Sequence, residues 1–227
     1  MKKVAVIVAG GTGSRMQADQ PKQFLPLLGE PILVHTLKTF SKTYPDIRLI
    51  VVLPAAHFED GQKLITTYYR EKVEFAQGGD TRFQSVKNGL ALLTEQEAIV
   101  FVHDAVRCLL TTTLIQRCFE AALKTGSAIP VVPAKDSIRL VTSAGQQVLN
   151  REEVMLVQTP QTFLSSWLLP AFQTTYEPSF TDEATVVEKA GKKVNLITGE
   201  VSNIKITQPV DLLIATQWLT ERNSTTA

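Results

Sequence analysis

Short runs of apolar, mostly β-branched residues alternate along the chain with longer stretches in which apolar residues recur every three or four positions. The short runs predict β-strands at Val4–Val8, Leu49–Leu53, Val73–Gln77, Ile99–His103, Ala128–Val132 and Val194–Thr198. The longer stretches predict helices at Ile32–Lys42, Phe58–Arg70, Arg82–Leu93, Thr113–Thr125, Leu164–Thr175, Asp182–Ala190 and Val210–Arg222. Continuously apolar runs such as "IVFVHD" are typical of parallel strands, which are buried on both faces. The pattern therefore predicts an α/β fold with a mostly parallel, twisted sheet and helices on both faces.

Residues 135–158 interrupt this alternation. They hold two β-like runs, Ser137–Thr142 and Gln147–Leu149, on either side of a Ser-Ala-Gly-Gln turn, with no helix between them. This pattern predicts a protruding β-hairpin arm. An isolated two-stranded hairpin is only marginally stable in water, so we expect the arm to pack against a partner, for which a second copy of the chain is the simplest candidate. No repeat or linker divides the sequence, and we expect one domain over residues 1–227.

The composition is that of a globular α/β domain, with 227 residues, 44% of them hydrophobic and 20% charged. Its 23 Lys and Arg residues nearly balance 22 Asp and Glu residues, and no run of five like charges occurs. The sequence therefore indicates neither a nucleic-acid partner nor a membrane surface. Any anionic ligand must be held by local groups.

No segment is predicted to direct the chain into or across a membrane. Residues 1–9 are similar to a short signal peptide, but their apolar run is brief and meets glycines without a small-residue cleavage site. No apolar stretch approaches the roughly 20 residues that a membrane-spanning helix needs. Cys108 and Cys118 have no Cys-x-x-Cys spacing and no accompanying histidine pair, which indicates neither a zinc site nor a disulfide framework. We expect a cytoplasmic protein.

Gly10, Gly11 and Gly13 follow the first predicted strand directly, at the carboxyl edge of the sheet where α/β proteins bind ligands. Glycine allows successive backbone N–H groups to surround phosphate oxygens, although a tight strand-to-helix turn explains the glycines equally well. A dinucleotide-binding loop is disfavoured because Met16 stands where its third glycine belongs. An ATPase phosphate loop is disfavoured because no Gly-Lys is followed by Ser or Thr.

Two cations follow these glycines. The planar fork of Arg15 suits two phosphate oxygens at once, and Lys22 is a single charge after a polar, Pro-containing stretch. Together they could hold a triphosphate and neutralise the charge that develops on an attacked phosphorus. Without the glycines, both would be interpreted as exposed charges of a surface loop.

The pattern Gly-Gly-x-Gly-x-Arg-Met followed by Pro-Lys-Gln-Phe resembles the nucleotide loop of the cytidylyltransferases that make activated sugar-alcohol phosphates. The resemblance implies a Rossmann-like nucleotidyltransferase fold and an enzyme that uses CTP. It implies that residues 11–15 wrap the triphosphate and that Arg15 and Lys22 stabilise the transition state. Further nucleotide contacts are implied for Ala9, Gly10, Gly11, Gly13, Ser14 and Ala105.

Two further segments that follow predicted strands match the family. In "QGGDTRFQSV", Asp80 or Thr81 could simply cap the next helix, whereas the resemblance implies a base and ribose pocket lined by Gly79, Asp80, Arg82 and Ser85. In "IVFVHDAVR", Asp104 ends a buried strand at the edge where a triphosphate would lie. It is well placed to hold Mg²⁺ or another divalent cation, which takes one or two carboxylates together with water and phosphate oxygens. The alternative for Asp104 is a cap on the following turn.

An acceptor phosphate needs groups that hold it in line but no enzymic base, because a phosphate monoester has a second pKa of about 6 and is mostly dianionic at neutral pH. The sequence offers Arg151, Thr159, Thr181 and Lys205, each with an ordinary structural explanation. The resemblance implies that they position a polyol phosphate together with Ser137, where many members of the family have Thr. It also implies a homodimer in which the arm is exchanged, so that Ser137 and Arg151 serve the neighbouring site.

Two acceptors compete within this family. Glu183 in "TDEA" and the stretch "LNREEVMLVQTPQTF" favour 2-C-methyl-D-erythritol 4-phosphate over ribitol 5-phosphate by resemblance. A nucleotide-binding module without catalysis would predict damage to Arg15, Lys22 or Asp104, and all three are intact. We therefore expect a Mg²⁺-dependent enzyme of non-mevalonate isoprenoid synthesis that joins the cytidylyl group of CTP to this polyol phosphate and releases pyrophosphate.

Overall fold

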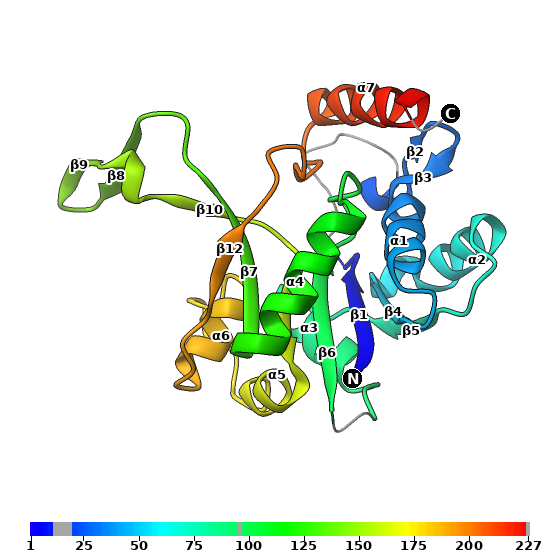
Figure 1. The fold of residues 1–227 in the computed structure, drawn as a ribbon, viewed down its shortest axis with the longest axis horizontal. Coiled ribbons are helices and arrows are strands. Elements are labelled where there is room, and N and C mark those ends of the chain that lie inside the picture. The colour runs from blue at the N-terminus through cyan, green and yellow to red at the C-terminus, as the bar shows by residue number, and fades with distance from the viewer. Residues whose placement is uncertain (11–19, 95–96, 226–227) are drawn as a thin grey trace.

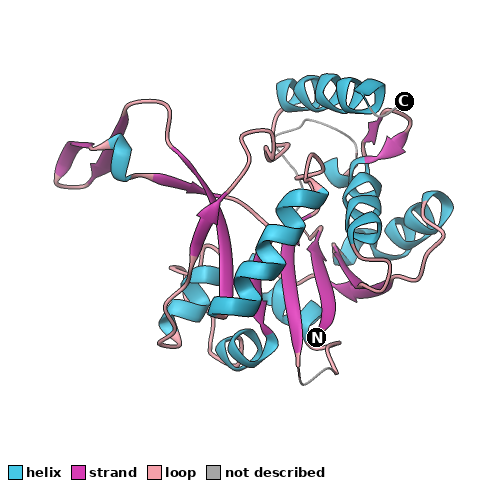
Figure 2. Cartoon of the chain, viewed as in Figure 1, coloured by secondary structure: helices cyan, strands magenta, loops and turns pink. Residues whose placement is uncertain are grey.

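The computed structural model describes residues 1–10, 20–94 and 97–225, and the statements below concern these residues. A central sheet runs in the order β10-β7-β11-β6-β1-β4-β5, with β12 paired to β7 beside this path (Figures 1 and 2). Its strands are β1 Lys2–Val8, β4 Arg48–Leu53, β5 Glu74–Gln77, β6 Ala98–Asp104, β7 Ser127–Pro133, β10 Met155–Val157, β11 Gln161–Leu164 and β12 Leu196–Thr198. Smaller sheets pair β2 Pro26–Leu27 with β3 Glu30–Pro31, and β8 Ile138–Thr142 with β9 Gly145–Leu149.

One half of the central sheet is parallel and the other half is mixed. Strands β6, β1, β4 and β5 are parallel, and Val8 is in register with both Val52 and Asp104, so their carboxyl ends share one edge. Strand β11 runs antiparallel to both β6 and β7, and β10 runs antiparallel to β7. The mostly parallel α/β sheet is therefore confirmed, while the short strands β10 and β11 were not predicted.

Seven helices of the described chain follow the predicted order: α1 Ile32–Thr43, α2 Phe58–Tyr68, α3 Arg82–Leu90, α4 Thr112–Thr125, α5 Ser165–Ala171, α6 Glu183–Lys189 and α7 Pro209–Thr225. The prediction of a helix at Leu164–Thr175 was wrong at both ends. Leu164 ends β11, and α5 stops at Ala171, directly after Pro170. Pro170 lies inside the helix, and the Phe172 N–H still donates to the Leu168 carbonyl at 3.1 Å where the helix ends.

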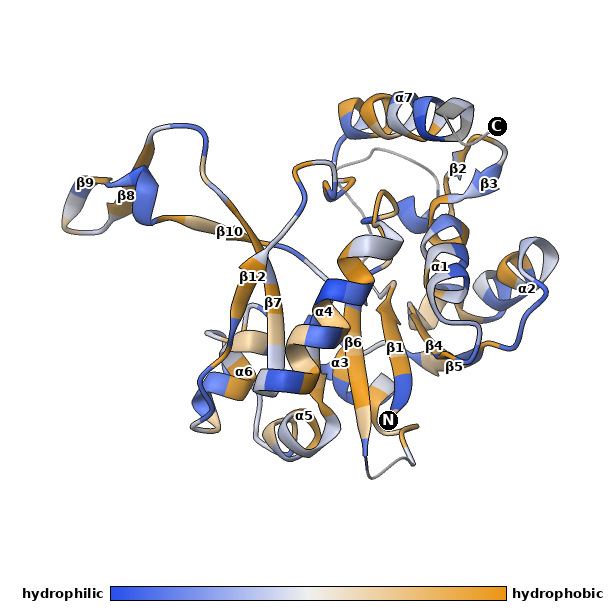
Figure 3. Ribbon diagram, in the orientation of Figure 1, coloured by the Kyte–Doolittle hydropathy of each residue, from blue (hydrophilic) through white to orange (hydrophobic). Residues whose placement is uncertain are grey.

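Alternate residues of the central strands belong to two cores on opposite faces of the sheet. Ala5 and Ile7 of β1 pack in a core with α1, α2 and α4, whereas Val4 and Val6 pack with α3, α5 and α6. Strands β1 and β6 are accordingly hydrophobic along most of their length (Figure 3). Burial of both faces explains why the sequence runs are continuously apolar. A further apolar cluster holds α7 against Leu27, around β2.

The predicted arm is present, and the β8–β9 hairpin stands clear of the sheet (Figure 1). Its strands begin at Ile138 and Gly145 where Ser137 and Gln147 were predicted. The last part of the predicted arm differs from the prediction. Its residues Met155–Val157 form β10, which pairs with β7 of the central sheet. Large apolar side chains along the arm and β10 are exposed, namely Leu140, Val141, Val148, Met155, Leu156 and Val157.

Both cysteines are buried free thiols, so no disulfide joins Cys108 to Cys118. Burial raises the pKa of each thiol to about 12, which keeps both protonated at neutral pH. Within the described ranges, no helix combines the length and the apolarity required to span a bilayer. The same part of the chain holds no group of three or more His, Cys, Asp or Glu side chains arranged to bind a metal ion.

Candidate active site at the carboxyl edge of the sheet

Asp104 ends β6 at the shared carboxyl edge of the parallel strands. Among the described residues, three cationic groups face its carboxylate. Lys205 Nζ lies 2.9 Å from Oδ2, Arg82 Nη2 lies 3.3 Å from Oδ1, and Arg107 Nε lies 3.6 Å from Oδ2. Burial alone would raise the pKa of the Asp104 carboxyl, but Arg82, Lys205 and Arg107 lower it well below its usual range. Asp104 is therefore ionised at neutral pH.

Arg82 connects Asp104 to helix α6. It is the first residue of α3, and its guanidinium also pairs with Glu183, the first residue of α6, through Nη1–Oε1 and through an Nη2–Oε2 bond of 3.0 Å. The Glu183 side chain is 1% exposed and that of Arg82 is 28% exposed. Burial would lower the pKa of Arg82, but Glu183 and Asp104 raise it, so the guanidinium stays charged. Two carboxylates thus fix Arg82 between β6 and α6.

The loops after β1 and β5 meet at Ser85. A Cβ at Gly10 would lie 3.0 Å from Ser85 Oγ, so the two loops approach closely here and a larger residue at position 10 would displace the Ser85 side chain. Ser85 Oγ accepts the Gly79 N–H at 3.1 Å and donates to the Thr81 carbonyl at 2.9 Å. Thr81 is the cap of α3, since its hydroxyl accepts the Gln84 N–H at 3.0 Å. The structure therefore gathers the predicted base-pocket segment beside the end of β1.

Buried Gln23 holds the chain that follows Lys22 against the end of β1. Its Nε2 donates to the Ala9 carbonyl at 2.6 Å. On the other side of the same strand end, the Ala105 N–H donates to the Val8 carbonyl at 3.0 Å. Lys22 itself begins a short 3₁₀ turn, Lys22–Phe24, and is half-buried. The sequence interpretation used Gln23 only as part of the Pro-Lys-Gln triplet and gave it no role.

Thr159 lies beneath Asp104, with its hydroxyl already paired inside the protein. Oγ1 accepts the Asp104 N–H at 3.1 Å and lies 3.0 Å from His103 Nδ1. Burial lowers the pKa of His103 to about 3, so the imidazole is neutral. Its Nε2 faces the Arg107 carbonyl at 3.3 Å, and a carbonyl can only accept, so we assign the ring proton to Nε2. His103 Nδ1 then accepts the Thr159 O–H, and Thr159 supports the backbone at Asp104.

Lys205 reaches Asp104 from the segment between β12 and α7. Asn203 anchors this segment, because its carbonyl accepts Arg107 Nη1 at 2.9 Å and its Nδ2 donates to the Thr159 carbonyl at 2.8 Å. Arg107 and Asn203 were not selected from the sequence as site residues. Their contacts join segments far apart in the chain, which no local pattern reveals.

Other predicted residues lie elsewhere or outside the described chain. Ser137 precedes β8, and Arg151 begins the turn Arg151–Glu153, where Nη1 donates to the Lys135 carbonyl at 3.3 Å. Both are exposed on the arm, which within one chain extends away from the end of β6 (Figure 1). Thr181 is exposed directly before α6, which Asp182 caps. Four predicted residues lie outside the described ranges: Gly11, Gly13, Ser14 and Arg15.

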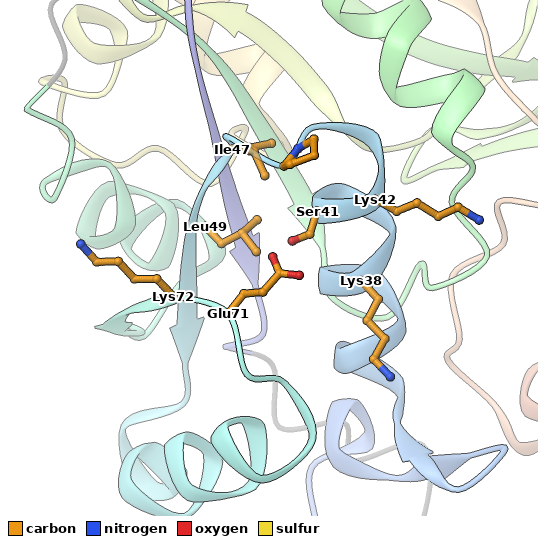
Figure 4. A pocket seen from close by; sticks show the side chains of 8 residues that line it. Lys38, Ser41, Lys42, Ile47, Leu49, Glu71 and Lys72 are labelled. Carbon is orange, nitrogen blue, oxygen red and sulfur yellow. The ribbon is translucent and has the colours of Figure 1, made fainter.

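A separate pocket of about 640 Å³ lies at the opposite end of the sheet, beside the start of β4 (Figure 4). Its lining residues are Lys38, Ser41, Lys42, Pro45, Ile47, Leu49, Glu71 and Lys72. The side chains of Lys38, Lys42 and Lys72 are directed away from its centre. None of the predicted site residues lines this pocket, so it is distinct from the cluster at Asp104.

Known proteins are similar in sequence to this chain over nearly its whole length. The family model described as 2-C-methyl-D-erythritol 4-phosphate cytidylyltransferase matches residues 3–221. A Bacteroides thetaiotaomicron protein of that name is 45% identical over 221 residues, covering 96% of this chain and 100% of the relative. The chain belongs to the 2-C-methyl-D-erythritol 4-phosphate cytidylyltransferase family.

Solved structures from this cytidylyltransferase family have the same fold. The Francisella tularensis 2-C-methyl-D-erythritol 4-phosphate cytidylyltransferase has a TM-score of 0.79 and 29% identity, covering 96% of this chain and 100% of that chain. The Anaerococcus prevotii 4-diphosphocytidyl-2C-methyl-D-erythritol synthase has a TM-score of 0.81 and 26% identity, covering 96% of each chain. The predicted α/β nucleotidyltransferase fold is therefore confirmed.

Proposed function

We propose that this protein transfers the cytidylyl group of CTP to 2-C-methyl-D-erythritol 4-phosphate, giving 4-diphosphocytidyl-2-C-methyl-D-erythritol and pyrophosphate. The observation that carries the proposal is the buried, ionised Asp104 with Arg82 and Lys205 at the carboxyl edge of the sheet. Membership of the cytidylyltransferase family supplies the substrate class. An edge that combines one carboxylate with several cations suits a metal-bound triphosphate and a second phosphate.

In the proposed reaction an oxygen of the acceptor phosphate attacks the α-phosphorus of CTP. A new P–O bond forms there, the bond from the α-phosphorus to the oxygen that bridges it to the β-phosphorus breaks, and pyrophosphate leaves with that electron pair. The dianionic acceptor needs no enzymic base. Lys205, whose side chain is 41% exposed, would hold the acceptor phosphate in line, and Lys22 and Arg15 would offset the charge that grows at the α-phosphorus.

Asp104 fits a role as ligand of Mg²⁺ or a similar divalent cation. Its carboxylate offers hard oxygen donors, and its lowered pKa keeps it deprotonated. Mg²⁺ takes one or two protein carboxylates and fills the rest of its shell with water and phosphate oxygens, so a single aspartate is sufficient. The ion would supply charge neutralisation of the triphosphate. Thr159 and His103 would keep the Asp104 backbone in place.

We also propose a cytoplasmic homodimer joined through the arm. The exposed apolar side chains on the arm and β10 support the homodimer, because large apolar side chains exposed together on a protruding element are typical of an interaction site. Ser137 and Arg151 stand apart from Asp104 of their own chain, so they would contribute to the acceptor pocket of the partner. Thr181, at the start of α6, would line the pocket from within the same chain.

Pyrophosphate release from CTP and Mg²⁺, with each polyol phosphate offered separately, tests the proposal. We expect turnover with methylerythritol 4-phosphate. Turnover with ribitol 5-phosphate alone would reassign the acceptor, and no turnover with either would favour a nucleotide-binding module without catalysis. An Asp104→Asn variant provides the inactive control, since it removes the charge at constant size.

A further inference from the structure

Lys205 lies in a stretch of the chain that forms no helix or strand of its own. Strand β12 ends at Thr198 and α7 begins at Pro209, and residues 199–208 between them form turns and irregular structure (Figure 1). No ladder of backbone hydrogen bonds fixes such a stretch. The position of Lys205 opposite Asp104 therefore depends on the individual hydrogen bonds that hold these residues.

Gln158 holds the first part of this stretch through its side-chain amide. It directly follows β10, and it is buried. Its Oε1 accepts the Glu200 N–H at 3.0 Å, and its Nε2 donates to the Glu200 carbonyl at 2.7 Å. The same Nε2 also donates to the Asn203 carbonyl, at 3.4 Å. Because a backbone N–H only donates and a carbonyl only accepts, this pairing fixes the orientation of the amide.

The contacts of Glu200 transmit this hold toward Lys205. The Glu200 carbonyl also accepts the Asn203 N–H at 3.0 Å, which closes a turn two residues before Lys205. On the other side, the Glu200 carboxylate accepts the hydroxyl of Thr111, the cap of α4, at 2.8 Å. Glu200 is thus fixed through its backbone and through its side chain, and the buried amide of Gln158 supplies the backbone contacts.

We propose that Gln158 is a positioning residue that keeps Lys205 in place for the acceptor phosphate. This inference rests on the proposed function, in which Lys205 holds that phosphate in line. The amide of Gln158 is occupied by backbone groups of the stretch, so it acts on the acceptor through Lys205. Loss of the pairing would release the Glu200 backbone and widen the range of positions that Lys205 adopts, and in-line attack requires a fixed position.

Gln158→Met tests the proposal kinetically, since methionine is of similar length and makes neither hydrogen bond. We expect the KM for methylerythritol 4-phosphate to rise about 3- to 10-fold, with kcat and the KM for CTP changed less than about twofold. Gln158→Asn, whose shorter amide cannot span both Glu200 groups, should behave alike and serves if the methionine variant does not fold. An equal rise in the KM for CTP would overturn the proposal.

Ser127→Ala is the matched control. Buried Ser127 begins β7, and its Oγ accepts the Asn195 N–H at 2.9 Å, so it holds the opposite end of β12 from Lys205. The control removes a buried hydrogen bond of the same region without touching residues 199–208. We expect an unchanged acceptor KM, and a rise equal to that of Gln158→Met would show a general effect of destabilisation and overturn the positioning role.

A double-mutant cycle with Lys205→Met tests whether the effect passes through Lys205. We expect Gln158→Met to change the acceptor KM less than about twofold once Lys205 is methionine, because the ammonium that it positions is gone. Full multiplication of the two effects on this KM would overturn the proposal.

Hydrogen exchange tests the same relationship without catalysis. We expect Gln158→Met to speed amide exchange in residues 200–206 about five- to tenfold, read by peptide mass spectrometry, because the hydrogen bonds that hold this stretch are lost. Ser127→Ala should leave exchange there unchanged. Unchanged exchange in Gln158→Met would overturn the positioning role even in a protein with no activity, whereas faster exchange without turnover in the unchanged protein would locate the failure in the proposed function.

Discussion

Lys205 Nζ lies 2.9 Å from Asp104 Oδ2, and this contact joins the segment before α7 to the end of β6. The Asp104 side chain is 9% exposed and the Lys205 side chain is 41% exposed, so Lys205 is the member of the pair that faces solvent. An anionic ligand that arrives from solvent therefore meets Lys205 before it meets Asp104. This asymmetry supports the assignment of the acceptor phosphate to Lys205 and of the metal ion to Asp104.

Lys205→Met should weaken the binding of the acceptor and leave the binding of CTP unchanged. Methionine keeps most of the apolar stem and removes the charge. We expect the KM for methylerythritol 4-phosphate to rise about 10- to 100-fold, because a hydrogen bond to a charged group contributes about 1.5–3 kcal/mol. Steady-state kinetics gives this KM, and calorimetry gives the CTP affinity. An equal loss of CTP affinity would contradict the assignment, and Lys189→Met, which removes an exposed ammonium paired with Glu177, is the control.

Glu183→Gln should destabilise the fold through Arg82. The variant leaves a guanidinium with one of its two carboxylate partners, and breaking a buried ion pair by removing one partner costs about 3–5 kcal/mol. We expect the loss in the free energy of unfolding to lie near the lower end of this range, since the Asp104 carboxylate still pairs with Arg82. Urea unfolding measures this loss. Glu177→Gln is the matched control, because its pair with Lys189 is exposed and should contribute less than about 1 kcal/mol. Equal effects of the two variants would show that Glu183 has no special role.

Thr159→Val should disturb the backbone at Asp104, whereas Thr159→Ser should not. Valine leaves both the Asp104 N–H and His103 Nδ1 without their shared partner, and each buried unsatisfied group costs about 1–3 kcal/mol. We expect a lower urea midpoint and a lower kcat for valine, with serine close to the unchanged protein in both. A valine variant with normal stability and a raised acceptor KM would instead place the Thr159 hydroxyl on the substrate.

Mixed dimers test whether Arg151 acts across an interface. Arg151→Ala and Lys22→Ala chains should each form weakly active dimers, but a heterodimer should regain activity because one of its two sites then has both residues intact. Differently tagged chains allow purification of the heterodimer before the assay. Activity no higher than that of the two parents would mean that each site is built within one chain.

The sequence predicted the parallel half of the sheet and its helices because these depend on local periodicity. Apolar runs of β1, β4 and β6 lie within strands in the structure, with ends close to those predicted. Strand β11 was not predicted because "QTFL" is short and follows a proline. It is a strand in the structure because it pairs with both β6 and β7. Its burial depends on neighbours distant in the sequence, which periodicity does not encode.

The candidate site was predictable where a residue follows a strand, and less so where partners come from distant segments. Asp104 was found from its place at the end of β6, and Arg82 from its place after β5. The contact between Arg82 and Glu183 joins residues 101 positions apart, and the hydrogen bond between His103 and Thr159 joins residues 56 positions apart. Glu183 had served only to favour one acceptor over another, and its buried charge beside Arg82 emerged from the structure.

Isotope labelling of the acceptor tests the central claim most directly. Methylerythritol 4-phosphate that carries ¹⁸O in its phosphate group is mixed with CTP, Mg²⁺ and the protein, and the products are separated and weighed by mass spectrometry. Attack of an acceptor oxygen on the α-phosphorus predicts that all of the label stays in 4-diphosphocytidyl-2-C-methyl-D-erythritol and that the pyrophosphate is unlabelled. Label in the pyrophosphate, or absence of the cytidylyl product, would contradict the proposed reaction.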